Sequence, residues 1–178
     1  NLRWEKRQDY LDYTAHKLAG GAIIGWFQGR FEFGPRALGA RSILADPRRV
    51  DMKDILNERV KFRESFRPFA PAILHEHSAE YFENPHDNPF MLLVFRIREE
   101  MRDRISSGVH VDGTGRGQTV HKEISPTFWE LIRSFREKTG IPVLLNTSFN
   151  VRGEPIINTP LEALQCFVKT KMDFLVMD

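Results

Sequence analysis

Basic residues gather in one stretch of the sequence, between Gly29 and Arg67. This stretch carries ten Lys/Arg against six Asp/Glu, whereas the whole chain carries 26 against 24. Arg36 and Arg41 each follow a glycine-containing turn, and glycine lets a backbone approach a ligand closely. The planar arginine fork binds phosphate or carboxylate, so the stretch predicts an anion site. The alternative is a tight turn with surface arginines on a solvated basic face.

Lys61 ends the helical run of this stretch, close in sequence to Arg63 and Arg67. A lysine ammonium is a compact point charge that suits a phosphate or carboxylate oxygen. Taken alone, Lys61 is better explained by an ion pair with Glu58 or Glu64. Beside the two arginines, it becomes a candidate for the same anion site.

A second candidate is the loop 112–116, Asp-Gly-Thr-Gly-Arg. Gly115 and Gly117 flank Arg116, and their conformational freedom lets its guanidinium reach inward. The loop is equally consistent with a plain hairpin, or with a turn that Asp112 caps through its own side chain.

The segment 146–150, Asn-Thr-Ser-Phe-Asn, follows a predicted buried strand and carries four polar side chains. Open α/β sheets bind ligands at the carboxyl ends of their strands. Asn146, Ser148 and Asn150 therefore suit an adenine, a ribose or a phosphate. An Asx-type turn is the alternative.

The remaining reactive side chains form no recognisable catalytic or metal-binding set. His75 and His77 lack the helical two-histidine metal spacing, and we expect His110 and His121 to be structural. Cys166 lies on the apolar side of a predicted helix and reads as an inert core thiol. Four carboxylates could hold Mg²⁺ beside a nucleotide, but nothing singles one out, so the metal ligands stay unknown. They are Asp46, Asp51, Asp112 and Glu154.

Helix and strand patterns alternate around these candidate residues. Helical spacing and capping signals predict helices at 8–19, 51–61, 77–82, 126–138 and 160–168. Apolar runs predict strands at 22–27, 41–45, 89–97, 141–145 and 173–177, with 89–97 the strongest buried strand. Pro68 and Pro71 confine a strand at 66–74 to a sheet edge or a bulge. Segments 109–112 and 118–120 predict a central hairpin. The fold class is therefore α/β, a mixed sheet covered by helices.

The composition limits the classes of protein to which the chain can belong. A chain of 178 residues, 41% hydrophobic and 28% charged, is typical of one globular domain. One cysteine excludes an internal disulfide, and nothing indicates secretion, so we expect a cytoplasmic protein. No apolar run is long enough to cross a membrane, and a net charge of +2 does not demand nucleic acid. The chain begins with Asn rather than Met, and we expect it to be a fragment or a processed product.

Four separated blocks of sequence resemble one family in the same order. They are GRFEFGPRALGARSILADPR, VKFRESFRPFAP, HVDGTGRGQTV and TGIPVLLNTSFNVRGEPI. These blocks are similar to the carboxyl-terminal domain of nodulation-type and antibiotic-type O-carbamoyltransferases. The resemblance implies a YrdC-like α/β domain, a twisted mixed sheet covered by helices, at residues 21–178. Residues 1–20 would then be a helix or linker from a larger, actin-like ATPase-fold domain at the amino-terminal side of the same polypeptide.

The resemblance also implies a reaction. The YrdC-like domain would bind ATP with Mg²⁺ and carbamoyl phosphate, form carbamoyl-adenylate and release pyrophosphate. The larger domain would then pass the carbamoyl group to an acceptor hydroxyl of a sugar or natural product. Fixed cations would offset the repulsion between the reacting anions, and no protein nucleophile is needed. Without the metal site of the amino-terminal domain, this chain alone should not complete the transfer.

The site residues are carried over position by position. The nucleotide- and anion-binding set would be Arg36, Arg41, Lys61, Arg116, Asn146, Ser148 and Asn150, with Lys61 and Arg116 acting in catalysis. Arg63 and Arg67 belong to a matching motif with less defined roles. Gly115 stands where we expect alanine in most relatives, a change that would loosen its loop.

Two rival functions remain at this stage. The basic stretch could track the backbone of RNA in a non-catalytic YrdC-like module, although the chain lacks the overall charge and the aromatic-basic interleaving typical of such binding. A basic face that only docks onto another domain is the third possibility.

Overall fold

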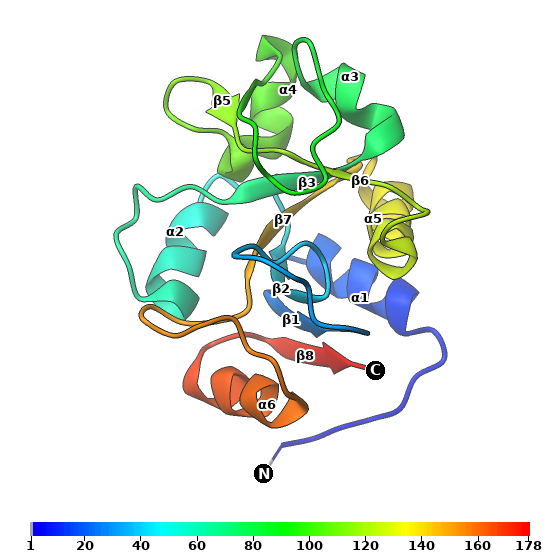
Figure 1. The fold of residues 1–178 in the computed structure, drawn as a ribbon, viewed down its shortest axis with the longest axis vertical. Helices are drawn as coiled ribbons and strands as arrows, with labels where there is room; N and C mark the ends of the chain where they lie inside the picture. Colours follow the sequence, from blue (N-terminus) through cyan, green and yellow to red (C-terminus); the bar gives the residue numbers. More distant parts are fainter. Residues whose placement is uncertain (1) are drawn as a thin grey trace.

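A six-stranded sheet forms the centre of the protein, whose computed structural model describes residues 2–178 (Figure 1). The strand order is β6-β3-β7-β2-β1-β8. Strand β1 runs parallel to β8 and β3 parallel to β6, whereas the other neighbours are antiparallel. The predicted mixed sheet is therefore confirmed. Its strands are β1 (Ile24–Phe27), β2 (Arg41–Ala45), β3 (Ala70–Leu74), β6 (Gln118–Val120), β7 (Val143–Ser148) and β8 (Phe174–Met177).

Helices cover both faces of this sheet. Helices α1 (Tyr10–Ala19) and α5 (Pro126–Thr139) pack on one face. Helix α2 (Met52–Leu56), its π-helical continuation Asn57–Lys61, and α6 (Pro160–Lys169) pack on the other. Successive side chains of a strand point to opposite faces, so each strand contributes to the hydrophobic cores on both faces of the sheet. None of the helices in residues 2–178 combines the length and apolar character that crossing a membrane requires.

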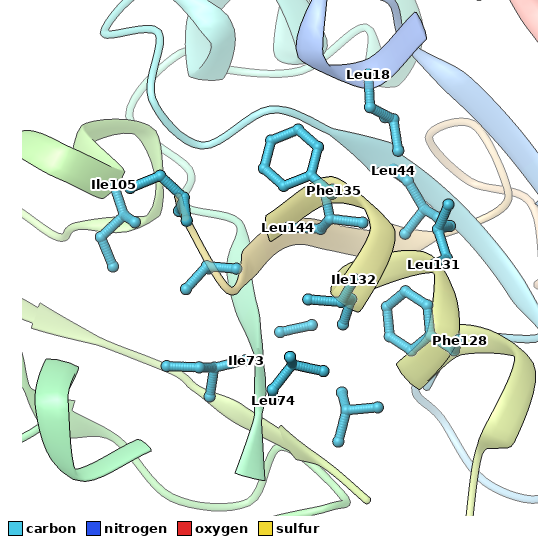
Figure 2. Close-up of a cluster of buried hydrophobic side chains, with 14 of the residues drawn as sticks. Leu18, Leu44, Ile73, Leu74, Ile105, Phe128, Leu131, Ile132, Phe135 and Leu144 are labelled. Carbon is cyan, nitrogen blue, oxygen red and sulfur yellow. The ribbon is translucent and has the colours of Figure 1, made fainter. Parts of the chain in front are cut away.

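The core under α1 and α5 explains why the predicted amphipathic helices form. Figure 2 shows apolar side chains of both helices meeting side chains of the central strands. Burying each large apolar side chain contributes about 1.5–3 kcal/mol, which offsets the backbone ordering that a helix requires. The labelled members are Leu18, Leu44, Ile73, Leu74, Ile105, Phe128, Leu131, Ile132, Phe135 and Leu144.

Helix α1 belongs to this core. Ala15 and Leu18 are fully buried in the cluster that α5 completes. The predicted division of the chain, with a linker at residues 1–20, begins at a residue outside the described part. The boundary at residue 20 stays a prediction, and in residues 10–19 the helix packs as part of the domain.

The predicted strand at 89–97 is wrong for most of its length. Only its last residues pair: β4 (Phe95–Arg96) pairs with β5 (Thr114–Gly115), and Ile97 forms an isolated bridge with Phe82. The buried Asn88 side chain replaces a strand ladder: its Oδ1 accepts the amides of Leu92 and Leu93 at 2.9 and 3.2 Å. Side-chain to backbone bonds of this kind offer the chain an alternative to a sheet. The apolar run is consequently an exposed loop, with Leu92 77% accessible.

The predicted central hairpin is also wrong. Residues 109–110 are irregular and 111–112 form a turn, and β6 pairs parallel with β3 instead of antiparallel with this segment. Asp112 Oδ1 accepts the amide and hydroxyl of Thr114 at 3.0 and 2.7 Å, which confirms the alternative in which Asp112 caps the turn.

Strand β3 is not at an edge, contrary to the inference from its prolines. It lies between β6 and β7. Pro71 is paired with Leu145 of β7, but the β6 ladder begins only at Ala72. Proline is tolerated here because only one neighbouring strand lies beside it.

The other short elements connect these layers. They are a 3₁₀ turn at His75–His77, α3 (Ser78–Tyr81), α4 (Glu99–Arg102) and a second 3₁₀ segment at Asp103–Gly108.

Candidate functional site

Four segments far apart in the sequence meet at one end of the sheet. In the antiparallel register, Ser148 at the end of β7 lies opposite Ser42 of β2, and Asn146 lies opposite Ala70 of β3. The beginnings of β2, β3 and β6 therefore surround the end of β7. This end of the sheet holds most of the predicted site residues.

Lys61 reaches the end of β7 from the π-helical turn. Its Nζ donates to the carbonyl of Ser148 and to both the carbonyl and Oδ1 of Asn150, the latter two at 2.9 Å. The side chain is only 4% exposed. The predicted alternative, an ion pair with Glu58 or Glu64, is not formed.

The environment of Lys61 lowers the pKa of its ammonium to about 7. Burial is the largest cause, and the charge of Arg63 adds to it. Burial disfavours the charged form, whereas three oxygen acceptors suit the three protons of an ammonium. Around pH 7 this lysine therefore exchanges between the charged and neutral forms, and a bound anion would favour the charged one.

Four arginines, Arg36, Arg63, Arg67 and Arg116, extend the positive charge beyond Lys61. Burial lowers the pKa of the Arg63 and Arg116 guanidinium groups, and neighbouring positive charges lower it further: Arg67 and Arg116 act on Arg63, and Arg36 acts on Arg116. Arg116 is half-buried, and its Nε has no hydrogen-bond partner. Within the described residues neither Arg36 nor Arg116 makes a salt bridge, so this charge has no local counterpart.

The π-helical turn also fixes Arg63. Asn57 is fully buried; its amide donates to the carbonyls of Ser65 and Arg67 at 3.2 and 3.0 Å, and its Oδ1 accepts from Arg63 Nε at 2.7 Å. Phe62 follows in the left-handed region, with φ of 50°. The π-helical turn and the residues that follow it thus hold two neighbouring cations, Lys61 and Arg63, in a fixed position.

Asn146 lies within β7 rather than in a loop, which corrects the predicted end of this strand. Its Nδ2 donates to Gln118 Oε1 at 2.9 Å and to the carbonyl of Ala37 at 3.2 Å. Its Oδ1 is buried without a partner. An unpaired buried acceptor costs about 1–3 kcal/mol, so this oxygen is a candidate contact for a ligand donor.

Arg41 is placed differently from the other predicted cations. Its guanidinium donates to the carbonyls of Gln28 and Gly29 at 2.7 and 2.9 Å and stacks on Phe27 at 3.6 Å. Only 4% of the residue is exposed, and burial lowers its pKa. Its fork holds the turn after β1, and ligand binding by Arg41 stays a prediction.

Ser148 and Asn150 contact Lys61 mainly through their backbone. The Asn150 amide nitrogen Nδ2 donates to the carbonyl of Glu154 at 2.8 Å, which ties down the loop after β7. Their binding to a ligand likewise stays a prediction.

Glu32 was not singled out by the sequence, yet it organises the loop that carries Arg36. Its two carboxylate oxygens accept the amides of Leu38, Ala40 and Arg41 at 2.8, 2.5 and 3.0 Å. Gln118 adds a second tie, from its Nε2 to the carbonyl of Leu38 at 2.8 Å. A lone glutamate in a basic stretch gives no sequence signal for such a role, because its partners are backbone amides.

The glycine at position 115 is closely packed. A Cβ there would lie 2.8 Å from Ile97 Cδ1 and 3.1 Å from the carbonyl of Gly108, so an alanine would require the Ile97 side chain and the Gly108 backbone to shift. The expectation that Gly115 loosens its loop stays a prediction.

The candidate Mg²⁺ carboxylates are each engaged elsewhere. Asp46 pairs with Arg48 at 2.6 Å and Asp51 with Arg49 at 2.7 Å. Asp112 caps its own turn, and Glu154 pairs with Lys169 at 3.3 Å. Among residues 2–178, the His/Cys/Asp/Glu group that does converge contains none of the four. Cys166 is 3% exposed with its pKa raised to about 11 by burial, as expected of a core thiol.

Two hollows lie on the described surface, and one of them reaches the site through Gln118. One, of about 500 Å³, lies between the loop 28–40 and the segment 118–128, with Gln118 in its wall. The other, of about 380 Å³, is lined by Lys53, Phe66, Pro68 and residues 109–112. Both fall within the size range of small-molecule sites.

The arrangement as a whole suits a polyanion. Partly buried cations without counter-charges repel one another, and a phosphate group would relieve that repulsion. Fixed positive charges of this kind stabilise charge that moves during phosphoryl or nucleotidyl transfer.

Comparisons with known proteins identify the family of this chain. The family described as "Carbamoyltransferase C-terminus" matches residues 15–178. The nodulation protein NolNO of Sinorhizobium fredii is 49% identical over 99% of this chain, which spans 26% of that protein. The 3'-hydroxymethylcephem-O-carbamoyltransferase of Amycolatopsis lactamdurans is 39% identical over 99% of this chain and 34% of its own length. The chain thus spans about a third or less of these relatives.

Solved structures confirm the fold. Full-length HypF in its phosphate- and nucleotide-bound form superposes with a TM-score of 0.65 at 17% identity, over 94% of this chain and 24% of that one. The Sua5 protein of P. abyssi, solved with L-threonine, gives 0.65 at 14% identity, over 98% and 48%. The YrdC-like α/β fold that the sequence predicted is therefore confirmed, and from the family match and the sequence relatives together, this chain belongs to the family of carbamoyltransferase carboxyl-terminal domains.

Proposed function

We propose that this chain is the nucleotide-activating domain of an O-carbamoyltransferase, which binds ATP and carbamoyl phosphate and forms carbamoyl-adenylate. The observation that carries the proposal is the gathering of Lys61, Arg63 and Arg116 beside the end of β7, where Glu64 acts on Arg63 but no salt bridge within the described residues reaches Lys61 or Arg116. Holding like charges together is unfavourable unless an anion neutralises them. The phosphate- and nucleotide-bound form of HypF, which shares the fold, supports a nucleotide at this fold.

The chemistry brings anions together. Carbamoyl phosphate yields carbamate and inorganic phosphate on reaction with water. A carbamate oxygen then attacks the α-phosphorus of ATP, the bond from that phosphorus to the bridging oxygen breaks, and pyrophosphate leaves with the electron pair. Attack by one anion on another needs positive charge that is already in place, which is the contribution of the arginines and Lys61.

Five of the predicted residues are assigned roles in this proposal. Arg116, with its Nε unpaired, and Arg36 would bind phosphate oxygens. Lys61 would stabilise the negative charge that develops during the reaction. Asn146 Oδ1 would accept from an amino or hydroxyl group of the nucleoside. Arg41, held by backbone carbonyls, would position the loop that carries Arg36.

The residues beside Lys61 do not form a carboxylate site for Mg²⁺. The candidate carboxylates are held in ion pairs or turns elsewhere. Mg²⁺ commonly binds through substrate phosphates and water, so we assign it no ligand from this chain and derive no step from it.

The acceptor step belongs to the rest of a longer polypeptide. The chain spans 26–34% of the nodulation and cephem-carbamoylating relatives. We propose that an additional amino-terminal, actin-like ATPase-fold domain receives carbamoyl-adenylate and transfers the carbamoyl group to a hydroxyl of a sugar or natural product.

The test measures pyrophosphate released by this chain from Mg²⁺-ATP, with and without carbamoyl phosphate. We expect release that requires both substrates, and a fall of roughly 100-fold in R116Q, as for the loss of one donor to a developing charge. The matched control is R59Q, because Arg59 is exposed on the same helical turn as Lys61. Absence of pyrophosphate together with absence of ATP binding by calorimetry would refute the proposal, and steeply salt-dependent RNA binding in its place would support the RNA-binding module.

A further inference from the structure

Two histidines and an aspartate converge at the opposite end of the sheet from Lys61. Strands β3 and β6 run parallel, with Leu74 opposite Val120, so the next residues of each strand, His75 and His121, lie side by side. Their imidazole centroids are 4.0 Å apart, with 27° between the ring planes. Asp87 reaches both rings: its Oδ1 lies 2.6 Å from His121 Nε2 and 3.8 Å from His75 Nδ1.

Hydrogen bonds that involve Thr119 and Asn88 hold the Asp87 carboxylate in place. Thr119 Oγ1 donates to Asp87 Oδ1 at 2.8 Å and accepts the backbone amide of Asn88 at 2.8 Å. Asn88 is 3% exposed, and its Nδ2 donates to the carbonyl of Gly117 at 2.7 Å. Oxygen and nitrogen ligands oriented by further hydrogen bonds are typical of metal sites.

The chemistry and spacing of the three groups suit a transition-metal ion. One ligand atom from each residue lies within 4.8 Å of the others. Zn²⁺ binds histidine nitrogen and carboxylate oxygen at about 2.0–2.2 Å, which places tetrahedral ligand atoms roughly 3.3 Å apart. Small side-chain rotations, which turn the imidazoles out of their stack, would bring the three to that spacing. Asp87 and His75 have side-chain exposures of 56% and 46%, so an ion can enter from solvent.

We propose that His75, Asp87 and His121 form a site for a divalent transition-metal ion of the Zn²⁺ class, with a fourth position open to solvent. The ion would join the ends of β3 and β6 to the loop before Asn88. Strand β6 is an edge strand of three residues, so a metal clip at its end would add stability where pairing is short.

The proposed metal site is distinct from the anion site. Lys61 and Arg116 lie near the beginnings of β3 and β6, whereas His75 and His121 follow their ends. The four steps from Ala70 to Leu74 of β3 separate the two ends by roughly 13 Å at about 3.3 Å per residue. The proposal therefore does not depend on nucleotide chemistry.

The test titrates the protein, freed of metal by a chelator, with Zn²⁺ in a calorimeter and with Co²⁺ while visible absorption is recorded. We expect one Zn²⁺ per chain, Co²⁺ absorption typical of tetrahedral coordination, and a rise in thermal midpoint on Zn²⁺ addition. D87N, H121N and H75Q should each weaken binding at least about tenfold. H16N is the matched control, since His16 lies exposed on α1.

The variants also keep the proposal open to refutation. All three side chains lie at the surface end of the sheet, and thermal midpoints without metal report whether each variant is folded. Stoichiometric binding that is equally strong in D87N and H16N would overturn the site. So would the lack of saturable binding by the unmodified protein, which would leave the cluster as a His–Asp ion pair.

Discussion

The charge state of Lys61 should make anion binding consume a proton. In the free protein its pKa is lowered to about 7, chiefly by burial. An anion about 4 Å away, at an effective dielectric of 20, contributes about 4 kcal/mol, which is roughly three pKa units. The bound ammonium would then titrate near pH 10. At pH 8 about 90% of the free lysine is neutral, so ATP binding should take up ~0.9 proton per chain.

Calorimetry in buffers of different ionisation enthalpy measures this uptake directly. We expect uptake near one proton at pH 8, and an ATP affinity that falls as pH rises above 7, by up to about tenfold per pH unit. K61M, which keeps the apolar stem and removes the titrating group, should bind more weakly and lose this uptake. K171M is the control, because Lys171 is exposed. The same uptake in K61M and the unmodified chain would refute the reasoning, as would a pH-independent affinity.

The same shift predicts the sign of the pH dependence of stability. Between pH 7 and 10.5 Lys61 is largely neutral when folded but protonated when unfolded, so the unfolded state binds more protons. The free energy of unfolding should therefore rise with pH across this window, by at most roughly 5 kcal/mol from this group. Below pH 7 the buried lysine is charged, which lowers the free energy of unfolding. In K61M, urea denaturation should show that the free energy of unfolding no longer rises with pH.

Two further substitutions test how the site is supported. G39A should destabilise the protein by about 1–3 kcal/mol more than G34A in urea denaturation: both glycines have positive φ, at 119° and 114°, but only a Cβ at Gly39 would meet Phe128, at 2.3 Å. Equal losses would mean that the clash is relieved by movement of Phe128. E32Q should cost about 2 kcal/mol in the same assay and weaken ATP binding, because a charged acceptor of three backbone amides becomes a neutral one. Unchanged stability and binding would show that the loop holds without this carboxylate.

Elements with strong periodicity could be predicted from the sequence, because one buried face decides them. The helix at 126–138 is observed as Pro126–Thr139, since Phe128, Leu131 and Phe135 all lie in one core. The strand at 41–45 is observed with the predicted bounds. The apolar run at 89–97 gave the same kind of signal, but the strand predicted from it is wrong for most of its length. The Asn88 side chain accepts a hydrogen bond from the backbone amide of Leu92, and the Leu92 side chain is exposed.

The candidate site could be predicted only in part, for a related reason. Cation types and glycines identify Lys61, Arg36 and Arg116, but not which backbone atoms they meet. The hydrogen bond that joins Lys61 to Ser148 and the strand pairing that brings His75 beside His121 are long-range and leave no local pattern. Glu32 and Asn57 act on backbone groups, so their roles emerge only from the folded chain.

The exchange of radioactive pyrophosphate into ATP tests the central claim most directly, because it requires reversible formation of an adenylate. With this chain, Mg²⁺-ATP and carbamoyl phosphate, we predict exchange that disappears when carbamoyl phosphate is left out and is lost in R116Q but not in R59Q. A chain that binds ATP yet catalyses no exchange, or that releases ADP and phosphate instead, would contradict carbamoyl-adenylate formation at the end of β7.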